Sequence, residues 1–296
     1  YVAWEFQQLA QKAGLKPIIG MEAYVAPGDR RDRGTPTARG ERPYYHLVLL
    51  ARDAEGYRNL VRLTSIGFLE GYYRRPRIDR EVLRQYAGGL IASSACMAGE
   101  IARHLMADHW DAARETAAWY AETFPDRFYL EVQAHDTAGQ DTLNERVFRL
   151  AAEVGLPVIA TNDVHFLRAE DHDAHDVLLC IGLGKDRDDA NRMRYDGGLY
   201  FKDPQEMAAR FPEHPEVLAN TLAIAEQVDV QHRKQYYVPR FPLPEDVPDE
   251  ATHLRRLVQE RATARYGEPL PAEIAERLDY ELSVIPTRAR ITRATS

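Results

Sequence analysis

The segment Thr161-Asn162-Asp163-Val164-His165 carries the strongest local signal for chemistry in this sequence. It directly follows a short apolar run that predicts a buried strand. Two side chains spaced two residues apart, where a strand leaves its sheet, can turn toward one point. A carboxylate and an imidazole placed together suit a borderline divalent metal such as zinc or manganese. The alternative is that Asp163 caps a turn and His165 is a surface histidine, and the spacing alone leaves the two interpretations balanced.

Three other residues are candidate metal ligands from different parts of the chain. Cys96 follows an apolar strand, and its thiolate can bind metal, although a lone cysteine there is more often a small buried hydrophobic residue. Glu22 lies in an apolar strand run, where a carboxylate is costly unless it is paired or bound to metal; it can also point to solvent from the strand end. His46 precedes an apolar strand, and by itself it is more typical of a hydrogen-bonded histidine.

Weaker candidates are polar groups that could orient such ligands. Glu131 lies inside an apolar strand and His135 follows it, while His172 and His175 lie near the start of a predicted helix, where solvation is the better interpretation. The charged residues 29–33 and 74–77 are interpreted as solvated runs, although the second is basic enough to contact phosphate.

The elements that must position these residues alternate between helix and strand. Short apolar strands separated by helices are typical of a parallel sheet buried on both faces, as in a barrel or a doubly wound sheet. In a barrel, chemistry lies on the loops that follow the strands. The pattern predicts strands at 17–25, 45–51, 89–93, 128–132 and 157–161, and helices at 2–13, 54–69, 100–107, 111–124, 141–154, 173–182, 215–228, 250–266 and 271–285.

The chain organisation predicts three parts. Residues 1–230 form the metal-binding domain, interrupted by an exposed polar loop at 27–42. Residues 231–285 contain a Pro-rich connector and two helices, because clustered prolines resist regular structure and mark boundaries. Residues 286–296 are basic, lack apolar periodicity and are interpreted as a disordered tail.

Composition narrows the classes of function. The chain has 296 residues, 45% hydrophobic and 28% charged, and a net charge of −8. A free-standing nucleic-acid binder is usually basic, so we expect any DNA contact to be local, metal-mediated or supplied by another part. The two cysteines form no C-x-x-C, which argues against a disulfide framework and for a reducing, cytoplasmic compartment. We expect no membrane partner, because no apolar run approaches about 20 residues.

Several motifs of other enzymes are missing from the sequence. There is no Walker motif, no G-x-G-x-x-G and no G-x-S-x-G. A paired-carboxylate motif of the polymerase type is also missing, because the cluster of Asp186, Asp188 and Asp189 lies in a segment too polar for a polymerase strand. Nucleotidyl transfer therefore cannot be assigned to these residues.

Taken together, the ordered segments resemble one known family. The chain is similar to the PHP (polymerase and histidinol phosphatase) domain of the bacterial DNA polymerase III alpha subunit from Tyr1 to about Ile285. The resemblance is carried by GLKPIIGMEAYV (14–25), HLVLLA (46–51), GYRNL (56–60), FPDRFYLE (124–131), LPVIATNDVHF (156–166) and DAHD (173–176).

The resemblance implies a distorted, TIM-like (β/α)7 barrel with a cluster of zinc, manganese or magnesium ions at one mouth. By motif match, the family's ligands fall on five residues: Glu22, His46, Cys96, Asp163 and His165. The implied chemistry is attack of activated water on a phosphodiester, as in a 3′→5′ exonuclease. The implied partners are a DNA primer-template, a proofreading subunit and a sliding clamp.

The resemblance also implies a fragment of a longer DNA-directed DNA polymerase that acts in DNA replication. The family's His-x-His and Asp-His-Gly-Asn motifs would precede Tyr1, and a polymerase palm would follow Ile285, so we expect an incomplete barrel that is inactive alone. Two alternatives are a stand-alone phosphoesterase and a non-catalytic scaffold for the proofreading subunit. The helices at 250–285 argue against the phosphoesterase, and the retained ligand residues argue against the scaffold.

Overall fold

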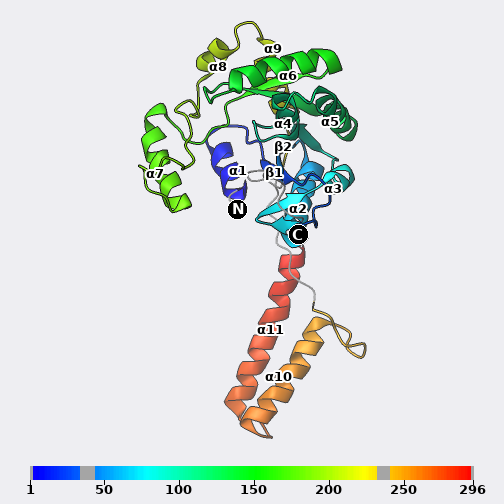
Figure 1. Cartoon of the computed structure of the whole chain (residues 1–296). Coiled ribbons are helices and arrows are strands. Elements are labelled where there is room, and N and C mark those ends of the chain that lie inside the picture. The colour runs from blue at the N-terminus through cyan, green and yellow to red at the C-terminus, as the bar shows by residue number, and fades with distance from the viewer. Residues whose placement is uncertain (1–2, 34–43, 232–240, 295–296) are drawn as a thin grey trace. The chain divides into compact units, whose positions relative to one another are not determined.

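A computed structural model describes residues 3–33, 44–231 and 241–294, and the side chains of 286–294 lie outside the description. The chain divides into two compact units, residues 1–231 and 232–296 (Figure 1). The predicted loop at 27–42 lies outside the described residues from residue 34 onward, as does the connector up to residue 240.

The first unit is built on one seven-stranded sheet. Its order is β3-β4-β1-β2-β5-β6-β7, and the strands are β1 (Gly20–Val25), β2 (Tyr45–Ala51), β3 (Tyr72–Tyr73), β4 (Arg75–Ile78), β5 (Leu90–Ser93), β6 (Phe128–Gln133) and β7 (Val158–Thr161). Within the described residues the sheet is open, with β3 and β7 at its two edges. The mixed α/β class is confirmed, whereas barrel closure is not seen in this part of the chain.

The expectation of an all-parallel sheet was wrong. Strands β5, β6 and β7 are parallel to one another, and β1 is parallel to β4, but β2 runs antiparallel to both β1 and β5. Parallel neighbours need a long crossover connection, whereas β2 returns directly beside β1, its predecessor in the chain. The start of β2 therefore lies at the same edge as the end of β1.

Eleven α-helices surround the sheet or form the second unit in the described part of the chain. They are α1 (Ala3–Lys12), α2 (Ala54–Leu69), α3 (Arg80–Gln85), α4 (Glu100–Met106), α5 (Trp110–Thr123), α6 (Gln140–Val154), α7 (His172–Leu183), α8 (Pro204–Arg210), α9 (Glu216–Gln227), α10 (Glu250–Tyr266) and α11 (Ala272–Ala294). The helix expected at 54–69 and the strand expected at 45–51 are confirmed residue for residue.

Five short elements were not predicted, namely β3, β4, α3, α8 and the 3-10 helix η1 (Ala169–Asp171). The signal for α8 is present in the sequence, because Asp203 and Glu206 form a capping box and Pro204 opens the helix. The interpretation of 286–296 as disordered was wrong for the backbone of 286–294, which continues α11 as far as Ala294.

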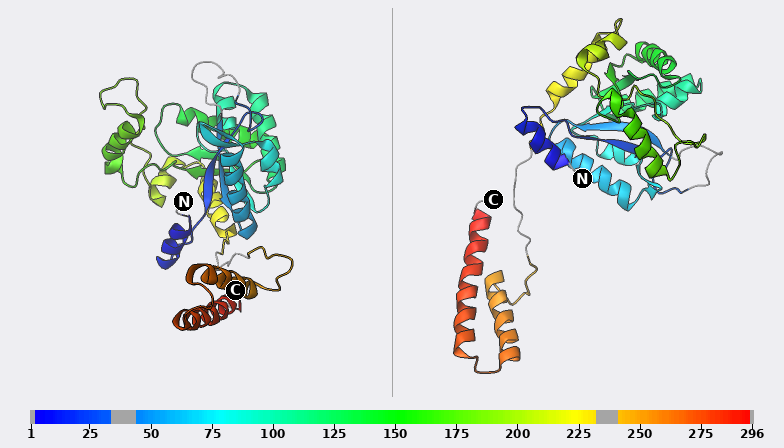
Figure 2. Two further views of the ribbon diagram at one scale, coloured as in Figure 1. Left: turned by 90° about the horizontal axis from the view of Figure 1, so that it is seen from below. Right: turned by 90° about the vertical axis from the view of Figure 1, so that its left-hand side faces the viewer.

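The two faces of the sheet bury different kinds of side chain. One face carries the main apolar core against α2 and α4 to α6, which includes Leu47, Leu49, Leu90, Ala92, Leu130, Val132, Val158 and Ala160. Burying a side chain of this size stabilises the fold by about 1.5–3 kcal/mol. Successive strand residues point to opposite faces, so residues of the other parity share the second face. Figure 2 shows the sheet and its covering helices from two more sides.

The second face combines a small apolar cluster with polar groups. Ile91, Tyr129 and Ile159 pack together with Ile224 of α9. The cross-strand register places Glu22, Ser93 and Glu131 on this face too. These polar side chains lie toward the edge formed by the ends of β1, β5, β6 and β7 and by the start of β2.

Two arginines that were assigned to solvated charge runs are buried. Arg30 is 4% exposed and its Nη1 lies 3.0 Å from Oδ2 of Asp79. Arg77 is 3% exposed and donates to the backbone carbonyls of Arg30 and Asp32, at 2.9 and 2.8 Å. Arginine has five fixed donors and can satisfy several buried acceptors at once, so both residues brace the segment that follows β1.

The second unit contains a helical hairpin of α10 and α11. Asp249 caps α10 by accepting from the backbone N–H of Thr252 at 2.7 Å. Arg255 of α10 and Asp279 of α11 form an ion pair at 3.1 Å. Among the described residues of both units, none of the helices combines the length and apolarity needed to cross a lipid bilayer.

Candidate metal centre

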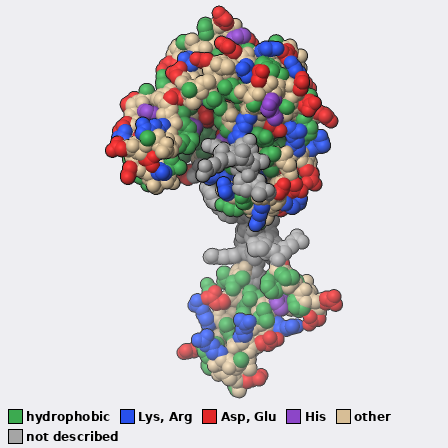
Figure 3. Space-filling view, viewed as in Figure 1, with side chains coloured by type: hydrophobic (Ala, Val, Ile, Leu, Met, Phe, Trp, Pro, Cys, Tyr) green, Lys and Arg blue, Asp and Glu red, His purple; other side chains and the backbone are tan. Residues whose placement is uncertain are grey.

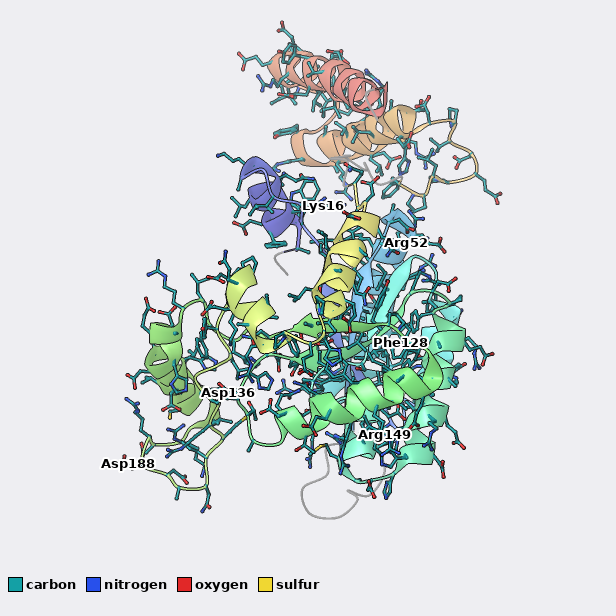
Figure 4. The ribbon with its side chains drawn as sticks, turned by 90° about the horizontal axis from the view of Figure 1, so that it is seen from above. Lys16, Arg52, Phe128, Asp136, Arg149 and Asp188 are labelled. Carbon is teal, nitrogen blue, oxygen red and sulfur yellow. The ribbon has the colours of Figure 1, made fainter. Side chains whose placement is uncertain are left out.

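A cavity of about 670 Å³ lies at the edge of the sheet where the polar face ends. All five residues predicted as ligands line this cavity: Glu22, His46, Cys96, Asp163 and His165. Figure 4 labels residues at both ends of β6, with Phe128 where it begins and Asp136 shortly after it ends, on the side that faces α7. The cavity is therefore bordered by strand ends on one side and by the α7 segment on the other.

The first pair of donors comes from β1 and β2. Glu22 is opposite Val48 in the register, so His46 is its diagonal neighbour on the same face. Diagonal neighbours are about 7–8 Å apart, which long side chains can bridge. Oε1 of Glu22 and Nδ1 of His46 lie 3.1 Å apart. A nitrogen and a carboxylate oxygen this close must share either a proton, in a hydrogen bond, or a bound cation.

The third donor is on the turn that follows β5. Sγ of Cys96 lies 3.6 Å from Nδ1 of His46 and accepts from the backbone N–H of Ala98 at 3.5 Å. Ala95 has a φ of 59°, which turns the chain sharply before the cysteine. The ligand atoms of Glu22, His46 and Cys96 all lie within 4.8 Å of one another.

Asp163 and His165 face the same cavity from the turn that follows β7. Asp163 has a φ of 45°, a left-handed conformation that is uncommon for a residue with a side chain. Nδ1 of His165 lies 2.6 Å from the backbone oxygen of Asp163, so this nitrogen donates to that oxygen and Nε2 is the ring atom left to bind a metal. The structure thus brings all five residues to one cavity and groups three of them tightly.

The electrostatics of the cavity favour a bound cation. Burial, and to a lesser extent the nearby carboxylates of Asp163 and Glu22, raise the pKa of the Cys96 thiol to about 12. Burial and the charge of Glu22 also raise the pKa of Asp163. Several acidic groups therefore oppose one another's ionisation here, and a divalent ion would remove that opposition.

The donor set also fits a divalent metal chemically. One carboxylate oxygen, one imidazole nitrogen and one thiol sulfur are typical zinc ligands. Nε2 of His46 is buried and has no hydrogen-bond partner among the described residues. The ring is therefore oriented so that Nδ1 faces Glu22 and Cys96, although this leaves Nε2 without a hydrogen bond to any described residue. A buried polar atom without a partner calls for an explanation, and metal binding by Nδ1 would provide one.

Glu131 and His135, predicted as supporting groups, are linked through Gln133, and both Gln133 and His135 line the cavity. Glu131 is 6% exposed and His135 is 3% exposed. Gln133 joins them, because its Nε2 donates to Oε1 of Glu131 at 3.1 Å and its Oε1 lies 2.8 Å from Nε2 of His135. Nδ1 of His135 accepts from the backbone N–H of Thr137 at 3.3 Å. Burial lowers the pKa of His135, so the ring is a neutral member of this chain of hydrogen bonds.

His172 and His175 do not line the cavity within the described residues. The ring of His175 lies 5.9 Å from that of His165, between centroids, and Nε2 of His172 lies 3.0 Å from the backbone oxygen of Tyr195. Both histidines therefore contact the segments that carry the site.

Sequence reasoning missed Gln133, and it considered Arg75 only as part of the basic run 74–77, which was interpreted as solvated but able to contact phosphate. The signal for Gln133 was a polar residue every second position, Glu131, Gln133 and His135, in a strand region that is otherwise apolar. Arg75 lines the cavity, and its guanidinium lies over the ring of Tyr24, 5.9 Å from the centroid. Elsewhere on the surface, in the view of Figure 3, acidic and basic side chains are interspersed.

The sequence of the chain is similar to sequences of known proteins. Residues 1–135 match the model of the PHP domain. The chain is 39% identical over 292 residues to the DNA polymerase III subunit alpha of Borreliella burgdorferi, covering 96% of this chain and 25% of the relative. It is 44% identical over 265 residues to that of Thermus aquaticus, covering 86% and 21%. It is 39% identical over 290 residues to that of Deinococcus radiodurans, covering 94% and 21%. The chain thus spans between a fifth and a quarter of the length of these relatives.

Proposed function

We propose that the chain is the PHP region of a replicative DNA polymerase, because residues 1–135 match the model of the PHP domain and nearly the whole chain is similar to DNA polymerase III subunits alpha. On this proposal, DNA synthesis in the bacterial cytoplasm is the activity of the longer protein. Its partners are a primer-template, a proofreading subunit and a sliding clamp. The open sheet would be the described part of a (β/α)7 barrel.

We propose further that the cavity is a metal-dependent phosphodiesterase centre of the 3′→5′ exonuclease type. The observation that carries this proposal is the convergence of a carboxylate, an imidazole and a thiol within 4.8 Å. Glu22, His46 and Cys96 would hold one divalent cation, with Asp163 and His165 as ligands on the adjoining wall. When bound, such a cation polarises a phosphoryl oxygen and lowers the pKa of water.

The chain's own residues would bind and orient the substrate. Arg75 supplies a permanent cation at the cavity, on the same strand as the buried Arg77 that fixes β4 in place. A guanidinium matches the geometry of a phosphate with two parallel hydrogen bonds. Arg75 would therefore hold a phosphate of the nucleic-acid chain while the ligand residues face the scissile bond.

The polymerase assignment can be tested in cells. An antibody raised against the chain should detect a protein roughly four times as long as its 296 residues, since the aligned part is 25% of the Borreliella burgdorferi relative. The protein recovered with that antibody should extend a primed DNA template. Detection of a 33.8 kDa species alone would contradict the assignment.

The exonuclease assignment needs a separate test on the longer protein. A 3′-labelled single strand should lose its terminal nucleotide only when zinc, manganese or magnesium is present. Asp163→Ala in the same protein should abolish this release and leave primer extension intact. If the variant releases the nucleotide as fast as the unmodified protein, the cavity is not the exonuclease site. If the unmodified protein binds metal but releases no nucleotide, a structural metal in a non-catalytic scaffold is favoured.

A further inference from the structure

Glu131 contacts both strand ends that carry donors, although it is not among the ligand atoms of the cluster. Its strand, β6, lies between β5 and β7 in the sheet. The turn after β5 carries Cys96, and the turn after β7 carries Asp163. A side chain in the middle strand can therefore set the separation of the two donor-bearing turns.

The hydrogen bonds of Glu131 reach in both directions. Oε2 accepts from Oγ of Ser93, the last residue of β5, at 2.5 Å. Oε1 accepts from Oγ1 of Thr161, the last residue of β7, at 2.6 Å. The backbone N–H of Glu131 also donates to Oγ of Ser94, at 2.9 Å, two residues before Cys96. The carboxylate and the backbone N–H of Glu131 together join the end of β5 to the end of β7.

A buried carboxylate such as that of Glu131 lowers the stability of the fold unless other interactions compensate for it. Burying a carboxylate removes its hydration, and none of the three side chains that donate to it, Ser93, Thr161 and Gln133, is charged. Replacing even a buried ion pair by apolar residues of similar volume is often neutral or stabilising, and a buried carboxylate that has no charged partner is less favourable still. Packing alone therefore does not explain a buried glutamate on β6, in a sheet whose other face is apolar.

We propose that Glu131 is a positioning residue that sets the distance between the Cys96 turn and the Asp163 turn by hydrogen-bonding Ser93 and Thr161. This inference rests on the proposed metal centre. This positioning role requires that one side chain hydrogen-bond Ser93 on one side and Thr161 on the other. The role does not require that Glu131 bind the cation. Glutamine keeps the shape and can hydrogen-bond both hydroxyls after they rotate, since a hydroxyl both donates and accepts.

The test compares three variants of the full chain loaded with Co²⁺ and then with Zn²⁺. Zinc affinity is measured by competition with a chelator, and the visible absorption of Co²⁺ reports the geometry around the ion. In Glu131→Ala, zinc affinity should fall about 10- to 100-fold, the range for groups that orient metal ligands, and the cobalt spectrum should change. Glu131→Gln should stay within about threefold of the unmodified chain and keep its spectrum.

Thr161→Val removes one hydrogen bond while preserving shape, and it remains informative where Glu131→Ala fails to fold. It should change the cobalt spectrum and weaken zinc binding. The matched control is Thr221→Val on α9, whose hydroxyl donates to the backbone oxygen of Val217 at 2.8 Å, outside the cavity. The control should leave both readouts unchanged.

The outcomes separate this inference from the proposed function. Equal losses in Glu131→Gln and Glu131→Ala would overturn the positioning role and make Glu131 a ligand. Unchanged binding and spectra in Glu131→Ala and Thr161→Val would also overturn it, while leaving the metal centre standing. Failure of the unmodified chain to bind zinc or cobalt would overturn the metal centre and this inference with it.

Discussion

Nδ1 of His46 lies 3.1 Å from Oε1 of Glu22, across an antiparallel pair of strands. The two residues are diagonal neighbours on the polar face of the sheet, so the β1–β2 register alone sets their approach. A slip of one residue would move one of them to the opposite, apolar face. The centre of the cavity therefore depends on the same register that aligns Leu47 and Leu49 in the core.

Replacing Cys96 should disrupt metal binding with little effect on the core. We expect Cys96→Ser to weaken zinc binding by at least about 100-fold, because loss of a group that merely orients a ligand already costs about 10- to 100-fold. Cys180→Ser is the matched control, since Cys180 is the other free cysteine and lies on α7 outside the cluster. Equal zinc affinity in the two variants would exclude the Cys96 thiolate as a ligand.

The turn that carries Cys96 should not tolerate a side chain at its end. A Cβ on Gly99 would lie 2.2 Å from the backbone oxygen of Ser94, so Gly99→Ala must push the turn outward. We expect this variant to lose zinc affinity and at least about 1 kcal/mol of unfolding free energy in urea. Gly182→Ala is the control, because nothing lies within 4 Å of its Cβ and alanine favours helix by up to about 1 kcal/mol. Normal zinc binding by Gly99→Ala would show that the turn is not fixed by this contact.

Arg75 should contribute to nucleic-acid binding at the cavity. Arg75→Ala should weaken binding of the zinc-loaded chain to a labelled oligodeoxythymidine by about 10-fold, the value of one charge-assisted hydrogen bond. Arg75→Lys should recover part of the loss, since it keeps the charge without the planar pair of donors. Arg58→Ala on α2 removes the same charge outside the cavity lining. An equal loss of affinity in Arg58→Ala would show that Arg75 acts only through the net charge of the chain and not through its place at the cavity.

The Arg30–Asp79 pair should make the free energy of unfolding depend on pH in the acidic range. Burial by itself favours neutral Asp79, but the N–H groups of Arg30 and Val82 and the charge of Arg30 outweigh it and lower the pKa. Because the folded pKa is below the unfolded value of about 3.9, the stabilisation is complete at neutral pH and is lost as pH falls through the folded pKa.

Urea denaturation of Asp79→Asn tests this pair. The variant should lose about 3 kcal/mol of unfolding free energy at neutral pH, and the difference from the unmodified chain should shrink below pH of about 4. Asp111→Asn is the control, because the side chain of Asp111 is 97% exposed in its pair with Arg114 and such pairs contribute at most about 1 kcal/mol. A difference for Asp79→Asn that is constant with pH would contradict the assigned pKa.

The sequence predicted the elements well where hydrophobic periodicity was long. Strand 45–51 and helix 54–69 are confirmed because apolar spacing and the capping residue Asp53 agree on their bounds. The short strands β3 and β4 were missed because an arginine-rich segment has no apolar alternation to read. The direction of β2 was missed because strand direction is set by the connection, which periodicity does not record.

The identity of the site residues could be predicted from the sequence more readily than their arrangement in space. Cys96 was a weak candidate by its position and became an expected ligand only through the family resemblance, since a lone cysteine after a strand is more often a small buried hydrophobic residue. The grouping of Glu22 with His46 depends on a register that no local pattern specifies. Arg30 and Arg77 were misassigned because their buried acceptors, Asp79 and backbone carbonyls, are distant in sequence.

X-ray absorption at the zinc edge of the loaded chain tests most directly whether Glu22, His46 and Cys96 share a cation. The spectrum should contain one sulfur neighbour at about 2.3 Å, together with nitrogen and oxygen neighbours at about 2.0–2.2 Å. Cys96→Ser should remove the sulfur neighbour, and Cys180→Ser should retain it. A zinc environment without sulfur in the unmodified chain, or one that survives Cys96→Ser, would contradict the metal centre described here.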